Sequence, residues 1–136
     1  MTALTLEAIL GPWELTAWEM RLGEALVRPL GDRPEGILYY AADGWMAVQI
    51  SAPGRPTIAS PDPLGGTERE RAAAYASSLA YCGTYELRGD HVLHRVRLST
   101  FPNWTRRGAS SVRPSGRESA HPSNTPDRDA RSGRQR

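Results

Sequence analysis

The 136-residue sequence has no lysine, a single cysteine and no long apolar run. Because Cys82 stands alone, it excludes an internal disulfide and a metal site built from several cysteines. No window approaches the roughly 18 apolar residues of a membrane-spanning helix. Residues 1–10 also lack the basic start and the long apolar stretch of a signal peptide. The sequence therefore predicts a cytoplasmic protein with no membrane partner.

Positive charge is concentrated at the end of the chain. Residues 1–105 hold 9 arginines against 12 acidic residues, a net charge of −3, whereas residues 106–136 hold 8 against 3, a net charge of +5. The first part gives no reason to expect nucleic acid as a partner. An interaction protein whose Arg-rich end attracts nucleic acid or an acidic partner is a remaining alternative. Against it, no aromatic residue is interleaved there to stack on bases.

The composition also changes at this point. From Arg106 onward Arg, Ser, Pro, Gly and Asp dominate, and Val112 is the only large aliphatic residue. Such a segment buries too little apolar surface to offset the entropy lost on ordering. We therefore predict one domain over residues 1–105 and a disordered tail over residues 106–136.

The first 105 residues read as successive β-hairpins. Asp43-Gly44 separates strands expected over Ile37–Ala42 and Trp45–Ser51, and such a pair favours a two-residue turn because its residues tolerate positive φ. Gly89-Asp90 separates a second pair, expected over Tyr81–Arg88 and His91–Thr100. Both faces of the first hairpin are largely apolar, so we expect it to be covered on both sides, and the pattern leaves open which face is interior.

A longer strand is expected over Trp13–Leu22, opened by Gly11 and Pro12, with a weak strand following at residues 25–30. Gly11 allows the backbone to bend, and the Trp13 indole is large enough to plug the base of a barrel. Residues 1–10 could form a short helix that leads into this strand, and a frayed terminus is the alternative.

One longer helix is predicted after a proline-rich loop over residues 52–64. Thr67 and Glu70 have the spacing of a capping box, in which each side chain bonds the other residue's amide. Apolar residues then recur at helical spacing: Ala72, Tyr75, Ala76 and Leu79. We expect this stripe to pack across the mouth or the outer wall of a barrel.

Five blocks of sequence carry a family resemblance. They are Gly11-Pro12-Trp13-Glu14-Leu15, residues 36–46, Asp62-Pro63-Leu64-Gly65-Gly66-Thr67, Tyr81-Cys82-Gly83-Thr84-Tyr85, and His94 followed by Phe101-Pro102-Asn103-Trp104. Through them the chain resembles the lipocalin-like domain family of small bacterial and fungal proteins, over roughly Leu10 to Trp104.

The resemblance implies an all-β fold with one short helix, an antiparallel barrel that encloses a cavity. After Trp104 the family pattern continues with about three more strands, whereas this sequence has the Arg-rich segment, which looks like a frameshifted or truncated terminus. An incomplete or open barrel is therefore expected, and an unpaired edge could promote self-association. For function, the resemblance implies binding of a small hydrophobic molecule; a cyclase or isomerase is the alternative that it leaves.

His94 is the candidate catalytic residue. On its strand it shares a face with Val96 and Leu98, so an apolar interior would place His94 in the cavity. A buried, neutral imidazole could act there as acid, base or hydrogen-bond partner. The alternative is a core histidine that bonds a backbone carbonyl or a tyrosine.

Aromatic side chains supply the candidate ligand site, since each combines a large apolar face with, in tyrosine and tryptophan, one polar tip. The predicted ligand-binding residues are Trp18, Tyr40, Trp45, Tyr81, Tyr85, His94, Asn103 and Trp104. Ordinary packing of strand aromatics, and turn chemistry for Asn103, are the alternatives. No metal site and no cofactor are expected, because the three histidines have no partners at ligand spacing.

Overall fold

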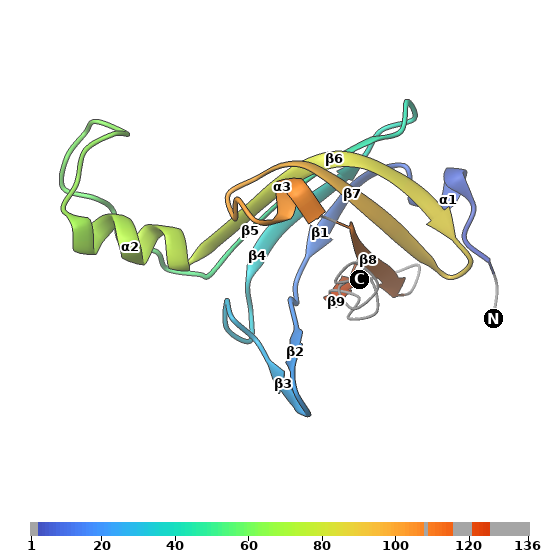
Figure 1. Ribbon diagram of the computed structural model, residues 1–136, viewed down its shortest axis with the longest axis horizontal. Helices are drawn as coiled ribbons and strands as arrows, with labels where there is room; N and C mark the ends of the chain where they lie inside the picture. The colour runs from blue at the N-terminus through green and yellow to red at the C-terminus, as the bar shows by residue number, and fades with distance from the viewer. Residues whose placement is uncertain (1–2, 108, 116–120, 126–136) are drawn as a thin grey trace.

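The computed structural model describes residues 3–107, 109–115 and 121–125. Seven strands form one antiparallel sheet in the order β1-β4-β5-β6-β7-β8-β9, and β2 and β3 form a separate ribbon (Figure 1). The strands are β1 (Gly11–Leu15), β2 (Met20–Leu22), β3 (Ala25–Val27), β4 (Glu35–Tyr40), β5 (Trp45–Ser51), β6 (Ser78–Arg88), β7 (His91–Ser99), β8 (Ala109–Ser115) and β9 (His121–Thr125). The helices are α1 (Leu6–Ile9), α2 (Glu68–Ala76) and α3 (Trp104–Arg107).

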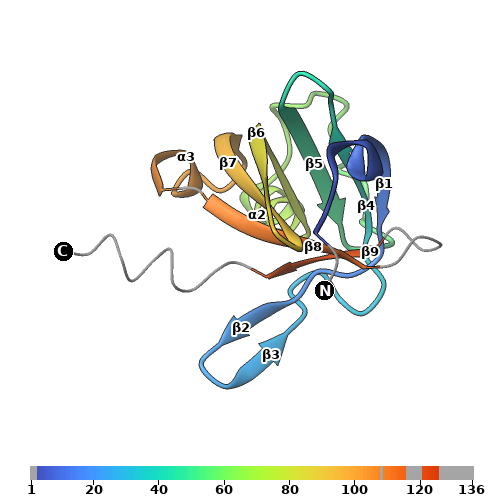
Figure 2. The same cartoon turned by 90° about the vertical axis from the view of Figure 1, so that its right-hand side faces the viewer.

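The large sheet curls into an open barrel. Figure 2 shows β7 and β8 turning away from β4 and β5, and β9 returning beneath β1. Strands β1 and β9 stand at the two ends of the pairing order and form no ladder with each other. The predicted all-β, incompletely closed architecture is therefore confirmed.

Part of the predicted tail lies in this sheet. Strand β8 pairs with β7 from Val92↔Val112 to Arg95↔Ala109, and β9 then pairs with β8. Residues 108, 116–120 and 126–136 lie outside the described residues. The division into a domain ending at residue 105 and a disordered tail stays a prediction.

The first strand is shorter than predicted. Strand β1 ends at Leu15, which pairs with Gly36, one residue before the end of its partner β4. The chain then leaves the sheet, and β2 pairs instead with β3. Half-buried Trp13 packs against the core, and its Nε1 donates to the carbonyl of Ile9 at 2.7 Å.

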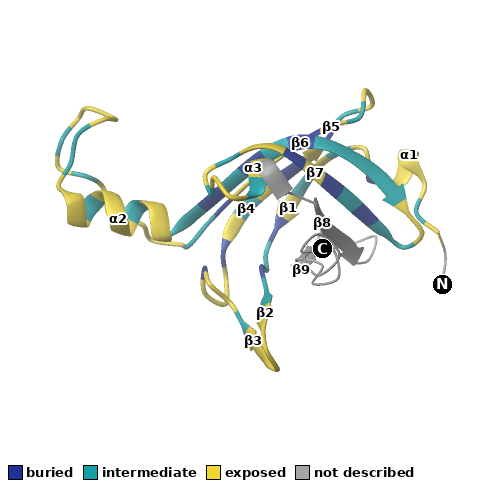
Figure 3. Ribbon diagram, viewed as in Figure 1, coloured by how far each residue is buried: buried dark blue, intermediate teal, exposed yellow. Residues whose placement is uncertain are grey.

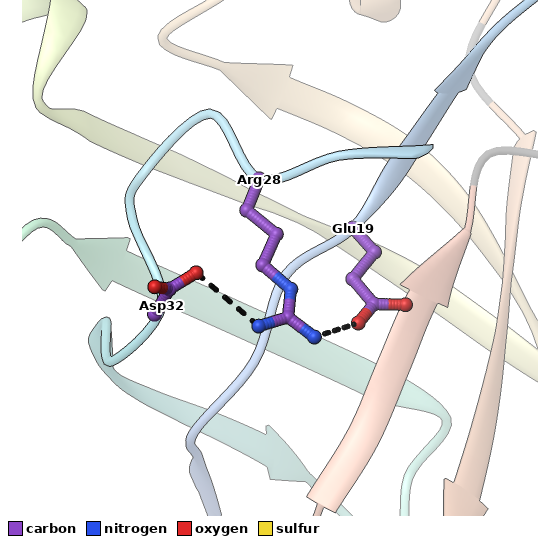
Figure 4. Close-up of polar contacts among 3 residues, drawn as sticks. All are labelled: Glu19, Arg28 and Asp32. Carbon is purple, nitrogen blue, oxygen red and sulfur yellow. Dashed lines mark hydrogen bonds and ion pairs between the residues drawn. The ribbon is translucent and has the colours of Figure 1, made fainter. Parts of the chain in front are cut away.

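An arginine braces the base of the β2–β3 ribbon. The Arg28 guanidinium donates to Glu19 Oε1 at 3.0 Å and to Asp32 Oδ1 at 3.2 Å (Figure 4). Since the Arg28 and Asp32 side chains are exposed and Glu19 is only partly buried, the pairs orient the ribbon more than they stabilise it.

The β4–β5 hairpin is covered on one face only, so the expectation of cover on both sides was wrong. Its buried face carries Leu38, Tyr40, Met46, Val48 and Ile50. Its other face exposes Ile37, Tyr39 and Trp45 (Figure 3). Among the described residues no helix packs on that second face, which leaves it in solvent.

The capping box of α2 is confirmed, but its predicted packing is wrong. Thr67 Oγ1 accepts a hydrogen bond from the Glu70 amide at 3.1 Å, and Glu70 Oε1 accepts one from the Thr67 amide at 3.0 Å. No residue of α2 is buried, and Figure 1 shows the helix beyond the ends of β5 and β6. The helix is instead tied to its own loop, because Arg55 donates to the Ala74 carbonyl at 2.9 Å. Leu79, expected on the helical stripe, lies in β6.

A β-bulge in the β6–β7 hairpin reverses one predicted orientation. Gly83 pairs with Val96, but the preceding Cys82 pairs with Leu98, so Arg97 is the extra residue. Leu98, expected beside His94 on the interior face, is consequently 68% exposed on the outer face. The shift needs a glycine at position 83, because a Cβ there would collide with the backbone carbonyl of Arg95.

Candidate functional site: a buried Tyr–His–Tyr triad

Three strands of the large sheet, β4, β6 and β7, bring two tyrosines onto the ring of one histidine. Tyr40 of β4 lies with its hydroxyl 2.6 Å from His94 Nε2, and Tyr81 of β6 lies with its hydroxyl 2.9 Å from His94 Nδ1. His94, on β7, has no exposed surface. Strand alternation positions all three residues, since each stands among buried residues of the interior face.

His94 and Tyr40 are uncharged at neutral pH. Burial lowers the pKa of His94 from 6.5 to about 3. Burial is the largest cause that raises the pKa of Tyr40, and the neighbouring Tyr81 and Tyr85 side chains raise it further. A neutral imidazole donates through one nitrogen and accepts at the other, so one phenol donates to His94 and the other accepts from it. The arrangement can offer a phenol hydroxyl to a bound molecule without placing a charge in the core.

Further aromatic rings pack edge-on around the triad. Tyr85 meets Tyr40 at 4.7 Å between ring centroids, and the Tyr85 hydroxyl donates to the Ala41 carbonyl at 2.6 Å. At the other side Trp104 meets Tyr81 at 5.6 Å. Phe101 lies against Trp104 at 5.7 Å. Apolar ring surface surrounding a few oriented polar groups is typical of small-molecule sites.

Comparison with known proteins agrees with this architecture. A family model described as a lipocalin-like domain matches residues 10–118. The chain belongs to the lipocalin-like domain family. Over 67 residues this lipocalin-like domain is 34% identical to the 4'-hydroxy-3'-methoxypropiophenone carrier protein ppsC of Aspergillus oryzae, a match covering 43% of this chain and 60% of the relative. The chain thus spans less than two thirds of that relative's length, and no solved structure matches it.

The lipocalin-like domain gathers most of the predicted site residues and separates the others. Tyr40, Tyr81, Tyr85, His94 and Trp104 form one connected cluster. Phe101 joins them, although sequence reasoning passed over it; its place in the Phe-Pro-Asn-Trp block was the available signal.

Three predicted residues lie apart from the triad's connected contacts. Trp45 is 46% exposed on the face of β5 opposite the triad. Asn103 is exposed beside α3. Trp18 is buried in the core, and its Nε1 has no hydrogen-bond partner among the described residues. The structure therefore places Trp45 and Asn103 away from the triad, whereas Trp18 lies in the same buried core cluster as Tyr40 and Tyr81.

Three other features bear on the type of site. Within the described part of the lipocalin-like domain, no group of three or more His, Cys, Asp or Glu side chains is placed to hold a metal ion. No helix in that same part is long and apolar enough to cross a bilayer. A hollow of about 270 Å³ lies between the proline-rich loop and α2, lined in part by Arg55, Ile58, Arg69, Glu70 and Ala74, and it contains none of the triad residues.

Proposed function

We propose that this lipocalin-like domain binds a small hydrophobic molecule on the inner side of its curved sheet, against the Tyr40–His94–Tyr81 triad. The observation that carries the proposal is a fully buried polar triad in an otherwise apolar core, with aromatic rings packed around it. Isolated polar groups cost free energy in such a core unless they are hydrogen-bonded, and here they bond one another. A ligand that accepts a hydrogen bond from a phenol group would join this network.

The relative's printed name supports an aromatic ligand class. That protein is named as a carrier of 4'-hydroxy-3'-methoxypropiophenone, a flat ring bearing a ketone. For this chain we propose the same class of ligand rather than the same compound. That class is a small aromatic molecule with an oxygen atom that accepts hydrogen bonds. The proposed contacts are Tyr40, Tyr81, Tyr85, His94 and Trp104. The lone thiol of Cys82 is compatible with a reducing compartment, and the cytoplasm is the proposed location.

Tryptophan fluorescence tests this proposal, with 4'-hydroxy-3'-methoxypropiophenone as the probe. Trp104 touches Tyr81, whereas Trp45 stands on the opposite face of the sheet. We expect saturable quenching in the unmodified protein, retained in Trp45→Phe and reduced by more than half in Trp104→Phe. Isothermal titration of both variants is the control, because it reports affinity independently of the three indoles that each variant retains. No saturable signal with the probe or a panel of aryl ketones, or equal quenching loss in both variants, would contradict the proposed position.

A proton-transferring cyclase or isomerase is the second candidate, since His94 touches two phenols. General bases work best when their pKa lies near the working pH, and a pKa of about 3 makes His94 a weak one. Binding without turnover is therefore the better supported reading. Mass spectrometry of the recovered probe separates the two: conversion by the unmodified protein, lost in a His94→Gln variant that still binds, would favour the enzyme.

A further inference from the structure

One buried polar atom of this lipocalin-like domain is left without a hydrogen bond. Among the described residues, Trp18 Nε1 is the one fully buried side-chain nitrogen or oxygen that has no partner. Trp18 is only 7% exposed and belongs to the core cluster that contains Tyr40 and Tyr81. An indole N–H can donate but cannot accept, so the group that satisfies it must be a hydrogen-bond acceptor.

Other aromatic side chains in or against this core already bond their polar atoms. Trp13 Nε1 donates to the carbonyl of Ile9, and the two phenols of the triad bond the ring nitrogens of His94. A buried donor that bonds nothing has already lost its contact with water in the folded protein. A ligand oxygen that reaches Trp18 Nε1 therefore gains a hydrogen bond without displacing an existing one.

The chain around Trp18 is braced from the solvent side. Trp18 lies in the connection between β1 and β2, and its neighbour Glu19 accepts a hydrogen bond from Arg28 at 3.0 Å (Figure 4). Arg28 also donates to Asp32 at 3.2 Å. The indole thus lies in the core while the adjacent carboxylate is held at the partly exposed side. A donor on a segment that is already oriented costs a ligand less entropy to use.

We propose that Trp18 Nε1 is the donor that recognises the oxygen atom of the ligand, while the ring of the ligand packs against the aromatic side chains around the triad. This inference rests on the proposed function and narrows the ligand class to aromatic carbonyl compounds. A carbonyl oxygen accepts the indole hydrogen and brings no donor of its own, whereas an alcohol would bring a second hydrogen that needs a partner in the core. A hydrocarbon of the same shape would leave the indole unpaired, and sites built around a buried polar group reject such analogues.

Isothermal titration with two matched ligands tests this role. The first ligand is 4'-hydroxy-3'-methoxypropiophenone, and the second is its analogue in which a methylene group replaces the ketone carbonyl. Trp18→Phe keeps an aromatic ring and removes the N–H. We expect it to lower the ratio of ketone affinity to analogue affinity by at least about tenfold. Trp13→Phe is the matched control, because the Trp13 N–H bonds Ile9, and it should leave this ratio unchanged. Circular dichroism establishes that both variants fold.

The indole proton of Trp18 gives a second measurement, made on the unmodified protein by NMR. Hydrogen bonding moves the resonance of an indole proton downfield. We expect the Trp18 resonance to move downfield when the ketone is added and to move much less when the methylene analogue is added. This readout does not depend on whether Trp18→Phe folds.

The outcomes separate the role of Trp18 from the proposed function. An affinity ratio that Trp18→Phe leaves unchanged, or an indole resonance that responds equally to both ligands, overturns the role of Trp18 and leaves the proposed site in place. So does an indole resonance that is already downfield in the free protein and that the ketone does not move, because it would show another partner. An unmodified protein that binds neither ligand overturns the proposed function and this inference together.

Discussion

Gly83→Ala should lower the free energy of unfolding by about 3 kcal/mol or more. A Cβ at position 83 would collide with the carbonyl oxygen of Arg95 and lie 2.9 Å from the backbone nitrogen of Arg97. Both neighbours are backbone atoms held by the β6–β7 ladder, so neither can move aside as a flexible side chain would. Relief requires the bulge to open, which would disturb the strand that carries His94. Urea denaturation followed by circular dichroism measures the loss.

Gly89→Ala in the same hairpin is the control for this prediction. Gly89 has φ +61° and open space around its Cα, so alanine there meets only the strain of the left-handed conformation, about 1–2 kcal/mol. The two variants therefore separate backbone strain from collision. If Gly83→Ala cost no more than Gly89→Ala, the close approach at the bulge would not hold in solution.

Stability should fall by about 2 kcal/mol as the pH is lowered from 6.5 to 5, through His94 alone. Its pKa is about 3 in the folded protein against 6.5 for an unperturbed histidine, because burial disfavours the imidazolium. Below pH 6.5 the unfolded chain therefore binds a proton at His94 that the folded chain does not bind. Acid consequently favours the unfolded state. The contribution is full above pH 6.5 and is lost progressively down to about pH 3.

His94→Gln should be less stable at pH 7.5, because the two phenols lose their ring partner, yet its stability should vary much less between pH 7.5 and 5. His91→Gln is the matched control: His91 is partly exposed beside Asp90 and should leave the slope intact. The stability measurements are limited to pH 5 and above because Glu70 and Glu86 have lowered pKa values, and the stability that these two carboxylates add is lost at more acid pH. An unchanged slope in His94→Gln would mean that the imidazole is solvated.

Local sequence chemistry was enough to determine the hairpins and the long helix. Asp43-Gly44 and Gly89-Asp90 marked both turns, and the reciprocal Thr67–Glu70 bonds fixed the start of α2, because each of these signals acts between residues close along the chain. Alternation placed His94 in the interior on the condition that the apolar face of its strand points inward, and the structure buries His94. The aromatic set was mostly predicted, but the pairing of Tyr40 and Tyr81 with opposite nitrogens of one ring was not.

Only the tertiary structure decided which face of each strand points inward and where each strand ends. Ile37 and Leu38 are equally apolar, and Trp45 is as aromatic as Tyr40, so the pattern could not choose between the faces of β4 and β5. Strand β1 stopped one residue short of the end of its partner β4, and one extra residue in β7 turned Leu98 outward. These outcomes depend on pairing between segments distant in sequence, and a shift of one residue in that pairing moves every following side chain to the other face.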